Sequence, residues 1–297
     1  MPLNLNPRTK AILQNLLVSF LWATSWVLIK YGLEEIPALT FAGLRYFLAF
    51  LILLVVFLRS KYLTEIPTIN RAKWLHLFVL GILLYTLAQG AQFMGLAYLP
   101  AVTVNLVLSF TTIVVAIFSM MLLSETPGLR QWAGIMLSII GALVFFHPIE
   151  VSPGNWTGWI AAILAMLFNS ISAVIGRSIN RTGDLSPLTI TVITMGIGGT
   201  LLLLTGLFFQ GLPEIGLVGW LIILWLAVIN TAFAFTLWNV TLRVLTAAES
   251  SVIINSMIIQ IPLLAVVFLG ETLSQKQIFG LAAAIAGILL VQLNSKD

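Results

Sequence analysis

Polar side chains recur at helical spacing inside the apolar stretches of this sequence. Tyr85, Gln89 and Gln92 follow one another at intervals that place them on one face of a helix. Asn105 and Ser109 are spaced in the same way in the next stretch. Hydroxyl and amide groups donate and accept hydrogen bonds without a formal charge, so such faces can line a cavity for a polar solute. For any single residue, a hydrogen bond between neighbouring helices is an equally good interpretation.

Aromatic side chains join these polar faces. Trp22 and Ser25 share a face of the first apolar stretch, and Trp238 falls on Gln92 when the sequence is shifted by 146 residues. Aromatic rings can stack on a ring or a cation, or they can pack against lipid and protein. Because the set recurs in both halves of the chain, it predicts one shared cavity with little charge, suited to a zwitterionic or neutral solute. The candidate substrate-binding residues are Trp22, Ser25, Tyr85, Gln89, Gln92, Asn105, Ser109, Asn169, Trp238 and Asn255.

Arg45 is the only charged residue that falls clearly inside an apolar stretch. A charge at such a depth in a bilayer is costly unless it pairs, reaches the interface or faces water. Two interpretations stay open: a structural arginine that binds backbone carbonyls or Glu34 and Glu35, or an arginine that contacts substrate or takes part in gating. Lys30 ends its apolar stretch, so we expect its ammonium group to extend toward the interface.

The sequence does not support catalysis by clustered ligands. It contains no Cys and two His, at the ends of apolar stretches. A lipid-modifying transferase or an intramembrane protease would need clustered His, Asp, Cys or metal ligands within those stretches, and none are found there. We therefore expect no catalytic residues, no metal site, no cofactor and no enzymatic activity.

The elements that position these residues are predicted to be membrane-spanning helices. The 297 residues are 60% hydrophobic and 8% charged, whereas soluble domains carry about 25% charged residues. The apolar stretches lack the alternation of apolar and polar residues that is typical of a β-barrel. Helices are then the structure that can satisfy the backbone hydrogen bonds in the hydrocarbon region. We expect an all-α membrane protein of ten transmembrane helices, near residues 11–31, 38–58, 74–96, 101–123, 130–147, 157–177, 187–209, 217–242, 247–269 and 276–293.

The distribution of basic residues predicts the orientation of these helices. Most Lys and Arg residues fall in the segments that share a side with the N-terminus, and basic residues concentrate on the cytoplasmic side. Both termini are therefore expected in the cytoplasm of a multi-pass protein, and we expect this membrane to be a bacterial inner (plasma) membrane.

The two halves of the sequence resemble each other. The segment LLSETPGLRQWAGIMLSIIGALVFF at 122–146 matches LGETLSQKQIFGLAAAIAGILL at 269–290, with Glu125 on Glu271. We expect two five-helix repeats, 1–148 and 149–297, and an odd number of spans inverts the second repeat. Inverted repeats are typical of secondary transporters, which bind substrate between the repeats.

Other residues are expected to act in gating or in structure. Each paired glutamate is predicted to cap the helix that follows it, with a gating latch as the alternative. The glycines after them predict close helix packing or a dimer surface. The gating or structural candidates are Arg45, Lys30, Pro262, Glu125 and Glu271.

Several motifs together resemble one family. They include FLWATSWVLIK (20–30), AGLRYFLAFLILL (42–54), GLAYLPA (95–101) and PLLAVVFLGETLSQKQIFGLAAAIAGILLV (262–291). In kind and order they resemble the drug/metabolite transporter superfamily, in particular its EamA-type ten-helix permeases. The second half departs from the first, because Met195 occupies the position that matches Arg45. The resemblance implies transport of small organic solutes, often export of metabolites or amino acids.

These observations predict a secondary transporter that moves small organic metabolites such as amino acids by alternating access through a central cavity. Because no Asp or Glu is expected to be buried within a span, and Glu249 falls near the cytoplasmic end of its span, facilitated transport is favoured over proton antiport on carboxylates. A carrier of nucleotide sugars or cationic drugs, or a membrane protein with another role, are the alternatives. The expected partners are a small-molecule solute and the lipid bilayer, with no nucleic acid, and a homodimer stays open.

Overall fold

A computed structural model describes residues 6–147, 155–261 and 274–292, and every element assigned within these ranges is helical. The first half contains α1 (Pro7–Gly32), α2 (Ala38–Leu58), η1 (Lys61–Thr68), α3 (Arg71–Gly81), η2 (Ile82–Gln89), α4 (Gly90–Tyr98), α5 (Ala101–Ser109), α6 (Thr111–Leu123) and α7 (Leu129–Phe146). The second half contains α8 (Trp156–Asn180), α9 (Pro187–Gln210), α10 (Leu217–Trp225), η3 (Leu226–Phe233), α11 (Ala234–Thr241), α12 (Ala247–Ile254) and α14 (Gln275–Gln292).

These helices follow the apolar stretches of the sequence closely. Within the described residues, eight helical runs are long and apolar enough to cross a membrane, and shorter apolar helices occur at Ala247–Ile261 and Gln275–Val291. The all-helical prediction is confirmed for the described residues, and the chain is an integral, multi-pass membrane protein. The count of ten spans stays a prediction.

Local sequence signals explain where several helices begin and end. At the start of α1 the Asn6 side chain accepts the Arg8 N–H, and at the start of α9 the Ser186 hydroxyl accepts the Thr189 N–H. Both helices carry Pro in the first turn, where its missing N–H costs no hydrogen bond. The helix α6 ends where Ser124 takes a left-handed conformation with φ of 56°.

Four of the predicted spans contain an interruption that the sequence pattern did not predict. The third and eighth runs each include a π-helical segment, η2 and η3. The fourth run breaks between α5 and α6 at Phe110, and the ninth breaks after α12 at Asn255. Short π segments in α-helices are frequent at functional sites. The interruptions fall on equivalent runs of the two halves, and all four runs contribute to the site described below.

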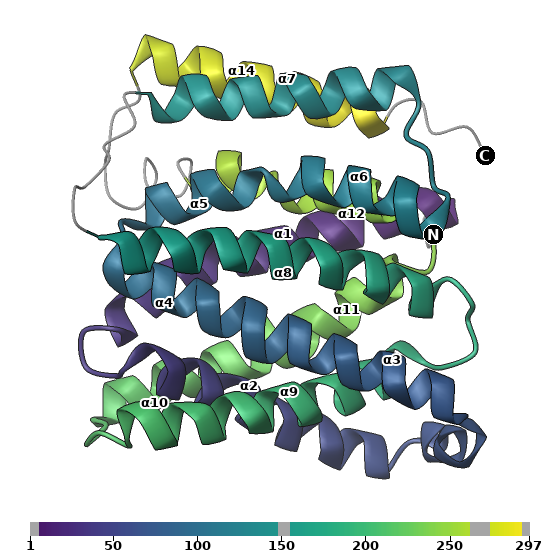
Figure 1. The fold of residues 1–297 in the computed structure, drawn as a ribbon, viewed down its shortest axis with the longest axis vertical. Coiled ribbons are helices and arrows are strands. Elements are labelled where there is room, and N and C mark those ends of the chain that lie inside the picture. Colours follow the sequence, from purple (N-terminus) through teal and green to yellow (C-terminus); the bar gives the residue numbers. More distant parts are fainter. Residues whose placement is uncertain (1–5, 148–154, 262–273, 293–297) are drawn as a thin grey trace, which may run out of the picture.

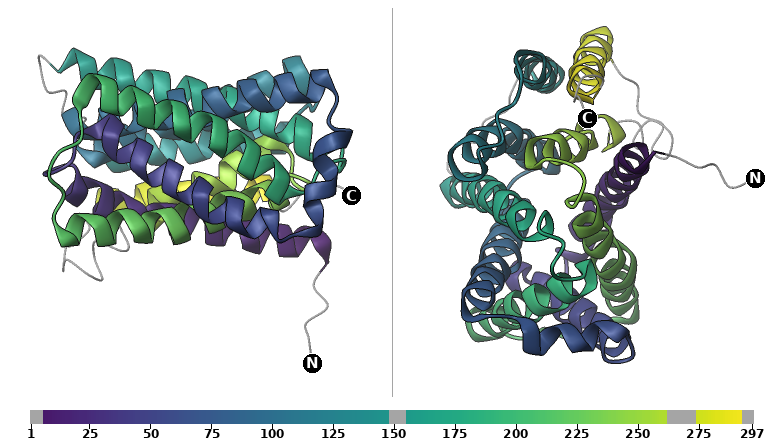
Figure 2. Two further views of the ribbon diagram at one scale, coloured as in Figure 1. Left: turned by 90° about the horizontal axis from the view of Figure 1, so that it is seen from below. Right: turned by 90° about the vertical axis from the view of Figure 1, so that its right-hand side faces the viewer.

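The helices form an elongated bundle in which α7 and α14 stand apart as a pair. Figure 1 shows this pair at one edge, next to α5, α6 and α12, while α2, α9 and α10 lie at the opposite edge. The end-on view in Figure 2 shows the same separation. Helix α1 begins and α14 ends at the same end of the bundle, which we call the termini end.

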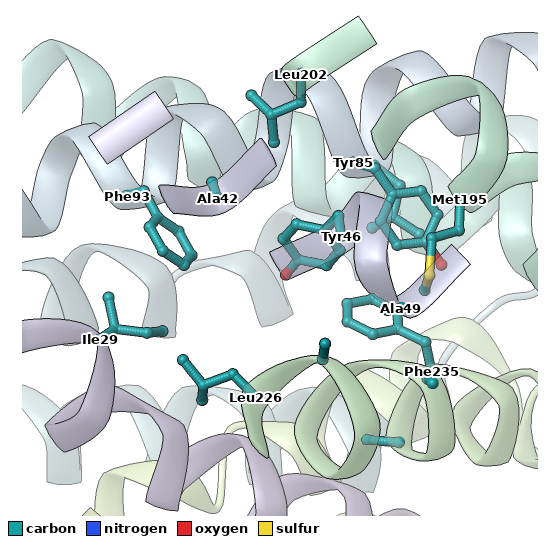
Figure 3. Packing of buried hydrophobic residues seen from close by; sticks show 14 of the residues in the cluster. Ile29, Ala42, Tyr46, Ala49, Tyr85, Phe93, Met195, Leu202, Leu226 and Phe235 are labelled. Atoms are coloured by element: carbon teal, nitrogen blue, oxygen red, sulfur yellow. The ribbon is translucent and has the colours of Figure 1, made fainter. Parts of the chain in front are cut away.

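The main hydrophobic core lies among α1, α2, η2, α9, η3 and α11. The rings of Tyr46, Tyr85 and Phe235 meet there from three different runs (Figure 3), with centroids between 5.2 and 5.9 Å apart. Met195 is fully buried in the same cluster. Aromatic side chains of this core therefore pack along one side of the bundle centre.

Candidate functional site

The candidate site is a cavity of about 140 Å³ at the centre of the bundle. Its walls come from α1, α2, η2, α4, α5, α6, α8, α11 and α12, so both halves of the chain contribute. The described residues that line it are Trp22, Ser25, Trp26, Arg45, Tyr46, Leu84, Gln89, Gln92, Asn105, Leu108, Thr111, Thr112, Asn169, Ala173, Phe235, Trp238, Ser250, Ser251, Ile254, Asn255 and Met257.

Most of the residues chosen from the sequence meet at this cavity. Eight of them line it, namely Trp22, Ser25, Gln89, Gln92, Asn105, Asn169, Trp238 and Asn255. Tyr85 does not, because its fully buried ring packs behind the wall against Tyr46 and Phe235. Ser109 also lies outside the lining and donates its hydroxyl to the Leu106 carbonyl of its own helix. That the eight bind a substrate stays a prediction.

One wall of the cavity is aromatic. The Trp22 ring lies 4.8 Å from Phe235 and 6.0 Å from Trp238, measured between centroids. The indole N–H of Trp22 donates to the Asn230 carbonyl at 3.1 Å, and that of Trp238 donates to the Ser250 hydroxyl at 3.1 Å. A buried indole needs such a partner. The hydrogen bonds fix both rings in place and leave their apolar faces available to the cavity.

Arg45 lies in the wall beside these rings and is 2% exposed. Its Nε donates to the Thr231 hydroxyl at 2.6 Å, and its Nη2 donates to the Asn230 carbonyl at 3.2 Å. Both acceptors belong to η3 in the second half. The sequence left two structural partners open for Arg45, backbone carbonyls or the carboxylates of Glu34 and Glu35. The guanidinium binds a backbone carbonyl, and among the described residues it forms no ion pair with Glu34 or Glu35.

Two polar atoms in the part of the cavity wall formed by α6 and the end of α12 have no hydrogen-bond partner among the described residues. The hydroxyl of Thr112 in α6 and the amide nitrogen of Asn255 after α12 are buried and make no hydrogen bond there. Both residues line the cavity. Buried polar groups are normally hydrogen-bonded, so these atoms are available to a ligand or to water.

Some lining residues were missed in the sequence, although a signal existed for two of them. Trp26 follows Trp22 by one helical turn and lines the cavity, and Tyr46 lies next to Arg45. The Tyr46 hydroxyl donates to the Gln89 side chain at 2.6 Å. Thr111 and Ser250 had no such signal, because neither shares a helical face with a candidate chosen from the sequence.

The predicted capping role of Glu125 is wrong. The helix after it, α7, is capped by Gly128, whose N–H is accepted by the Gln131 side chain. Glu125 instead accepts from Arg177 Nε at 2.9 Å and from the Ala247 backbone N–H at 3.3 Å. It therefore stabilises the first turn of α12, because long-range packing brings that helix end closer than the following helix.

A second ion pair links α1 to the first turn of α12 at the termini end. Arg8 donates to Glu249 at 2.7 Å, and Glu249 also completes a capping box with Thr246. Both carboxylates that contact α12 thus lie at the positive end of its dipole. This end of the bundle is held by ion pairs, and no described residue of the cavity lining forms one.

Of the remaining gating or structural candidates, Lys30 is described by the structure and lies outside the cavity lining. Lys30 donates to the carbonyls of Leu96 and Leu99 at 2.6 and 3.1 Å, which satisfies the C-terminal end of α4. Pro262 and Glu271 lie outside the described residues. Within the part of the chain that the structure describes, no group of three or more His, Cys, Asp and Glu side chains could hold a metal ion.

Comparisons with known proteins agree that the chain is similar to a family of transporters. The model of the EamA-like transporter family matches residues 9–147 and again residues 156–293. The uncharacterized transporter YvbV of Bacillus subtilis (strain 168) is 27% identical over 98% of this chain and 94% of its own length. The UDP-galactose translocator of Mus musculus is 24% identical over 54% of this chain and 44% of its own length.

A solved crystal structure has the same fold. It superposes on this chain with a TM-score of 0.80 and covers 96% of this chain and 97% of its own. The two sequences are 18% identical, so the likeness concerns the fold alone.

Proposed function

Because this chain belongs to the EamA-like transporter family, we propose that it is a secondary transporter that moves small organic metabolites, such as amino acids, through the central cavity. The observation that carries this proposal is the cavity itself, which is lined from both halves of the chain by aromatic, amide and hydroxyl side chains. Pockets of this composition hold a small molecule by its apolar surface and orient it with a few polar groups.

The proposed architecture is ten spans in two five-helix repeats of inverted topology, 1–148 and 149–297. Two matches to one family model, and helix interruptions on equivalent runs, support this division. Rocking of inverted repeats about a site near the middle of the membrane produces alternating access. The broken runs at Phe110 and Asn255 lie beside the cavity and would allow parts of these helices to move separately.

The proposed location is a bacterial inner membrane, with the termini end in the cytoplasm. The support is the basic bias of the segments at that end, together with the ion pairs of Arg8 and Arg177. The start of α1 and the end of α14 lie on the same side of the bundle (Figure 1), as an even number of spans requires.

A nucleotide-sugar carrier is the second candidate, because one relative is named a UDP-galactose translocator. Diphosphate groups are typically held by several arginines or lysines. Arg45 is the single charged side chain among the described residues of the lining. The lining therefore favours a solute with less charge than a nucleotide sugar.

The test is solute flux into proteoliposomes that contain the purified, full-length protein. A panel of amino acids, amines, purines and sugars is supplied with and without a pH gradient. We expect uptake of at least one small organic solute, and no accumulation driven by the gradient, because no described carboxylate lies in the cavity wall. Gradient-driven accumulation would contradict facilitated transport, and absence of flux for the whole panel would contradict the proposed function.

Three variants connect flux to the cavity. Gln89→Ala, Asn105→Ala and Trp238→Ala each remove a lining side chain and are expected to reduce flux while the protein still folds. Ser109→Ala is the matched control, because its hydroxyl bonds within its own helix. Unchanged flux in all three lining variants would contradict the assignment of the cavity as the substrate path.

A further inference from the structure

One guanidinium in the cavity wall has no counter-charge among the described residues. Arg45 is 2% exposed, and no described Asp or Glu oxygen lies within 4.0 Å of it. We propose that Arg45 is the anion-binding group of the cavity, and that the transported solute is a small molecule with a single carboxylate that pairs with it. This inference rests on the transport function proposed above.

The hydrogen bonds of Arg45 leave part of the guanidinium free for a ligand. Nε and Nη2 donate to Thr231 and Asn230, which are neutral acceptors that position the group without cancelling its charge. Nη1 makes no hydrogen bond with any residue that the structure describes. A guanidinium has five N–H donors in a planar fork that fits a carboxylate, so donors remain for an anion.

The surroundings of Arg45 hold it in place, and only 2% of its surface is exposed. The guanidinium carbon lies 5.2 Å from the centre of the Tyr46 ring and 5.9 Å from that of Phe93. The Asn230 carbonyl that holds it also accepts from Trp22, while the Asn230 amide donates to the Leu21 carbonyl. Charges attract more strongly where water is excluded, and a preorganised partner loses less entropy on binding.

The burial of this charge is costly to the empty protein. A buried ionic group without a partner is strongly destabilising, and a charge within a bilayer is rare unless it serves a pathway. The matching position of the second half holds Met195, which is fully buried in the apolar core. The fold therefore accommodates an apolar side chain at this repeat position, and a charge in the first half needs a reason other than packing.

The remaining cavity walls offer contacts for the apolar part of such a solute and for a second polar group. Trp22, Phe235 and Trp238 offer an apolar surface, and the unpartnered Thr112 hydroxyl and Asn255 amide offer a second polar contact. The cavity of about 140 Å³ is close to the engineered cavity of about 150 Å³ that binds benzene. A nucleoside diphosphate exceeds this space and brings more negative charge than one guanidinium can balance.

The test compares ligands of equal shape and different charge on the unmodified protein. The full-length protein in nanodiscs is titrated at constant ionic strength with phenylacetate, phenylacetamide, phenethylamine and uridine diphosphate, and binding is measured from the shift in Tm. We expect phenylacetate to bind about tenfold more tightly than phenylacetamide, which corresponds to about 1.4 kcal/mol. We expect phenethylamine and uridine diphosphate to bind more weakly than phenylacetate.

Variants assign the preference to Arg45. Arg45→Gln should abolish the preference for phenylacetate over phenylacetamide, and Arg45→Lys should retain part of it. Arg71→Gln, at an exposed site at the start of α3, is the matched control and should behave as the wild type. If Arg45→Gln does not fold, the comparison of the two isosteric ligands on the wild type still decides the question.

Two results would overturn the inference. One is equal affinity for the carboxylate and the amide, and the other is failure of phenylacetate to bind at millimolar concentration. Both leave the proposed transport function standing if proteoliposomes still take up neutral or cationic solutes. Conversely, a carboxylate preference without flux of any solute would support Arg45 as an anion site and contradict transport.

Discussion

The central cavity and the α7–α14 pair differ in how closely their helices pack. Around the cavity, polar atoms of Thr112 and Asn255 are left without partners and side chains leave a space of about 140 Å³. Between α7 and α14 no such space is left, because Gly134, Gly141, Gly280 and Gly287 bring the two backbones into contact. We call these four glycines the glycine seam.

The difference separates the proposed solute path from a region whose close packing stabilises the fold. A Cβ at Gly141 would lie 2.5 Å from the Ala284 nitrogen, and one at Gly287 would lie 2.5 Å from the Gly134 carbonyl. Close contact of this kind stabilises helix pairs in membranes, where the hydrophobic effect between helices is absent. A larger side chain should therefore destabilise the protein when it is added at the glycine seam. The same change at the cavity wall should fill the cavity with little loss of stability.

Gly141→Leu should have the largest effect. The new side chain meets the Ala284 backbone and cannot be accommodated by a rotamer change, and overpacking typically costs about 1–3 kcal/mol or more. We expect little folded protein, measured as the yield of monodisperse material and its Tm. Gly128→Ala is the control, because a Cβ added at Gly128 would have no atom within 4 Å apart from those of its chain neighbours. A normal Tm for Gly141→Leu would contradict the role of the seam.

Ser251→Leu adds comparable volume to the cavity wall and should have a different effect. Ser251 lines the cavity on α12, so the larger side chain can project into the space. We expect a Tm close to that of the wild type and a loss of most solute flux in proteoliposomes. A variant that unfolds, or one that transports at the wild-type rate, would remove the distinction between the two regions.

Glu125→Gln tests a third region, the charged contacts at the termini end. The substitution keeps the shape of the side chain and removes the charge that Arg177 and the first turn of α12 contact. Hydrogen bonds to charged groups are worth about 1.5–3 kcal/mol, but the amide oxygen of the substituted side chain can still accept from the same donors. Only part of this free energy is therefore lost, and a smaller loss of stability than in the seam is expected. The measurement is chemical denaturation in micelles, and a stability equal to the wild type would show that the pair contributes nothing.

Asp184→Asn should have the smallest effect. Asp184 is exposed and pairs with Lys73 at 2.8 Å, and the hydrogen bond from that ammonium lowers the pKa of the carboxyl. Any stabilisation is present at neutral pH and is lost as the pH falls through the lowered pKa. Exposed pairs contribute little, so we expect no measurable change in Tm at neutral pH. A clear drop would mean that this loop supports the bundle.

The sequence predicted the helices well because hydropathy and helix length are local properties. The predicted span 38–58 coincides with α2, and eight of the ten proposed binding residues line one cavity. The π segments, the breaks at Phe110 and Asn255, and the partners of Glu125 were not predicted. The partners of Glu125 lie on helices that are distant in the sequence, and hydrophobic periodicity reports neither such contacts nor a local change of helix type.

Tyr85 illustrates the same limit at the level of a single residue. Its spacing from Gln89 is that of one helical face, yet Tyr85 packs behind the wall and Gln89 lines the cavity. Both residues lie in η2, a π segment. A wider turn changes the angle between successive side chains, so the α-helical spacing misplaced one of them.

The most direct test of alternating access is the accessibility of the cavity from each side of the membrane. The natural chain contains no Cys, so Ser251→Cys in the cavity and Ser138→Cys in α7, against the glycine seam, each create a single thiol. Membrane-impermeant maleimide is added to either face of oriented vesicles. We expect the thiol at position 251 to be labelled from both faces with loss of flux, and the thiol at position 138 to be labelled from neither. Labelling of position 251 from one face only, or full flux after labelling, would contradict alternating access through this cavity.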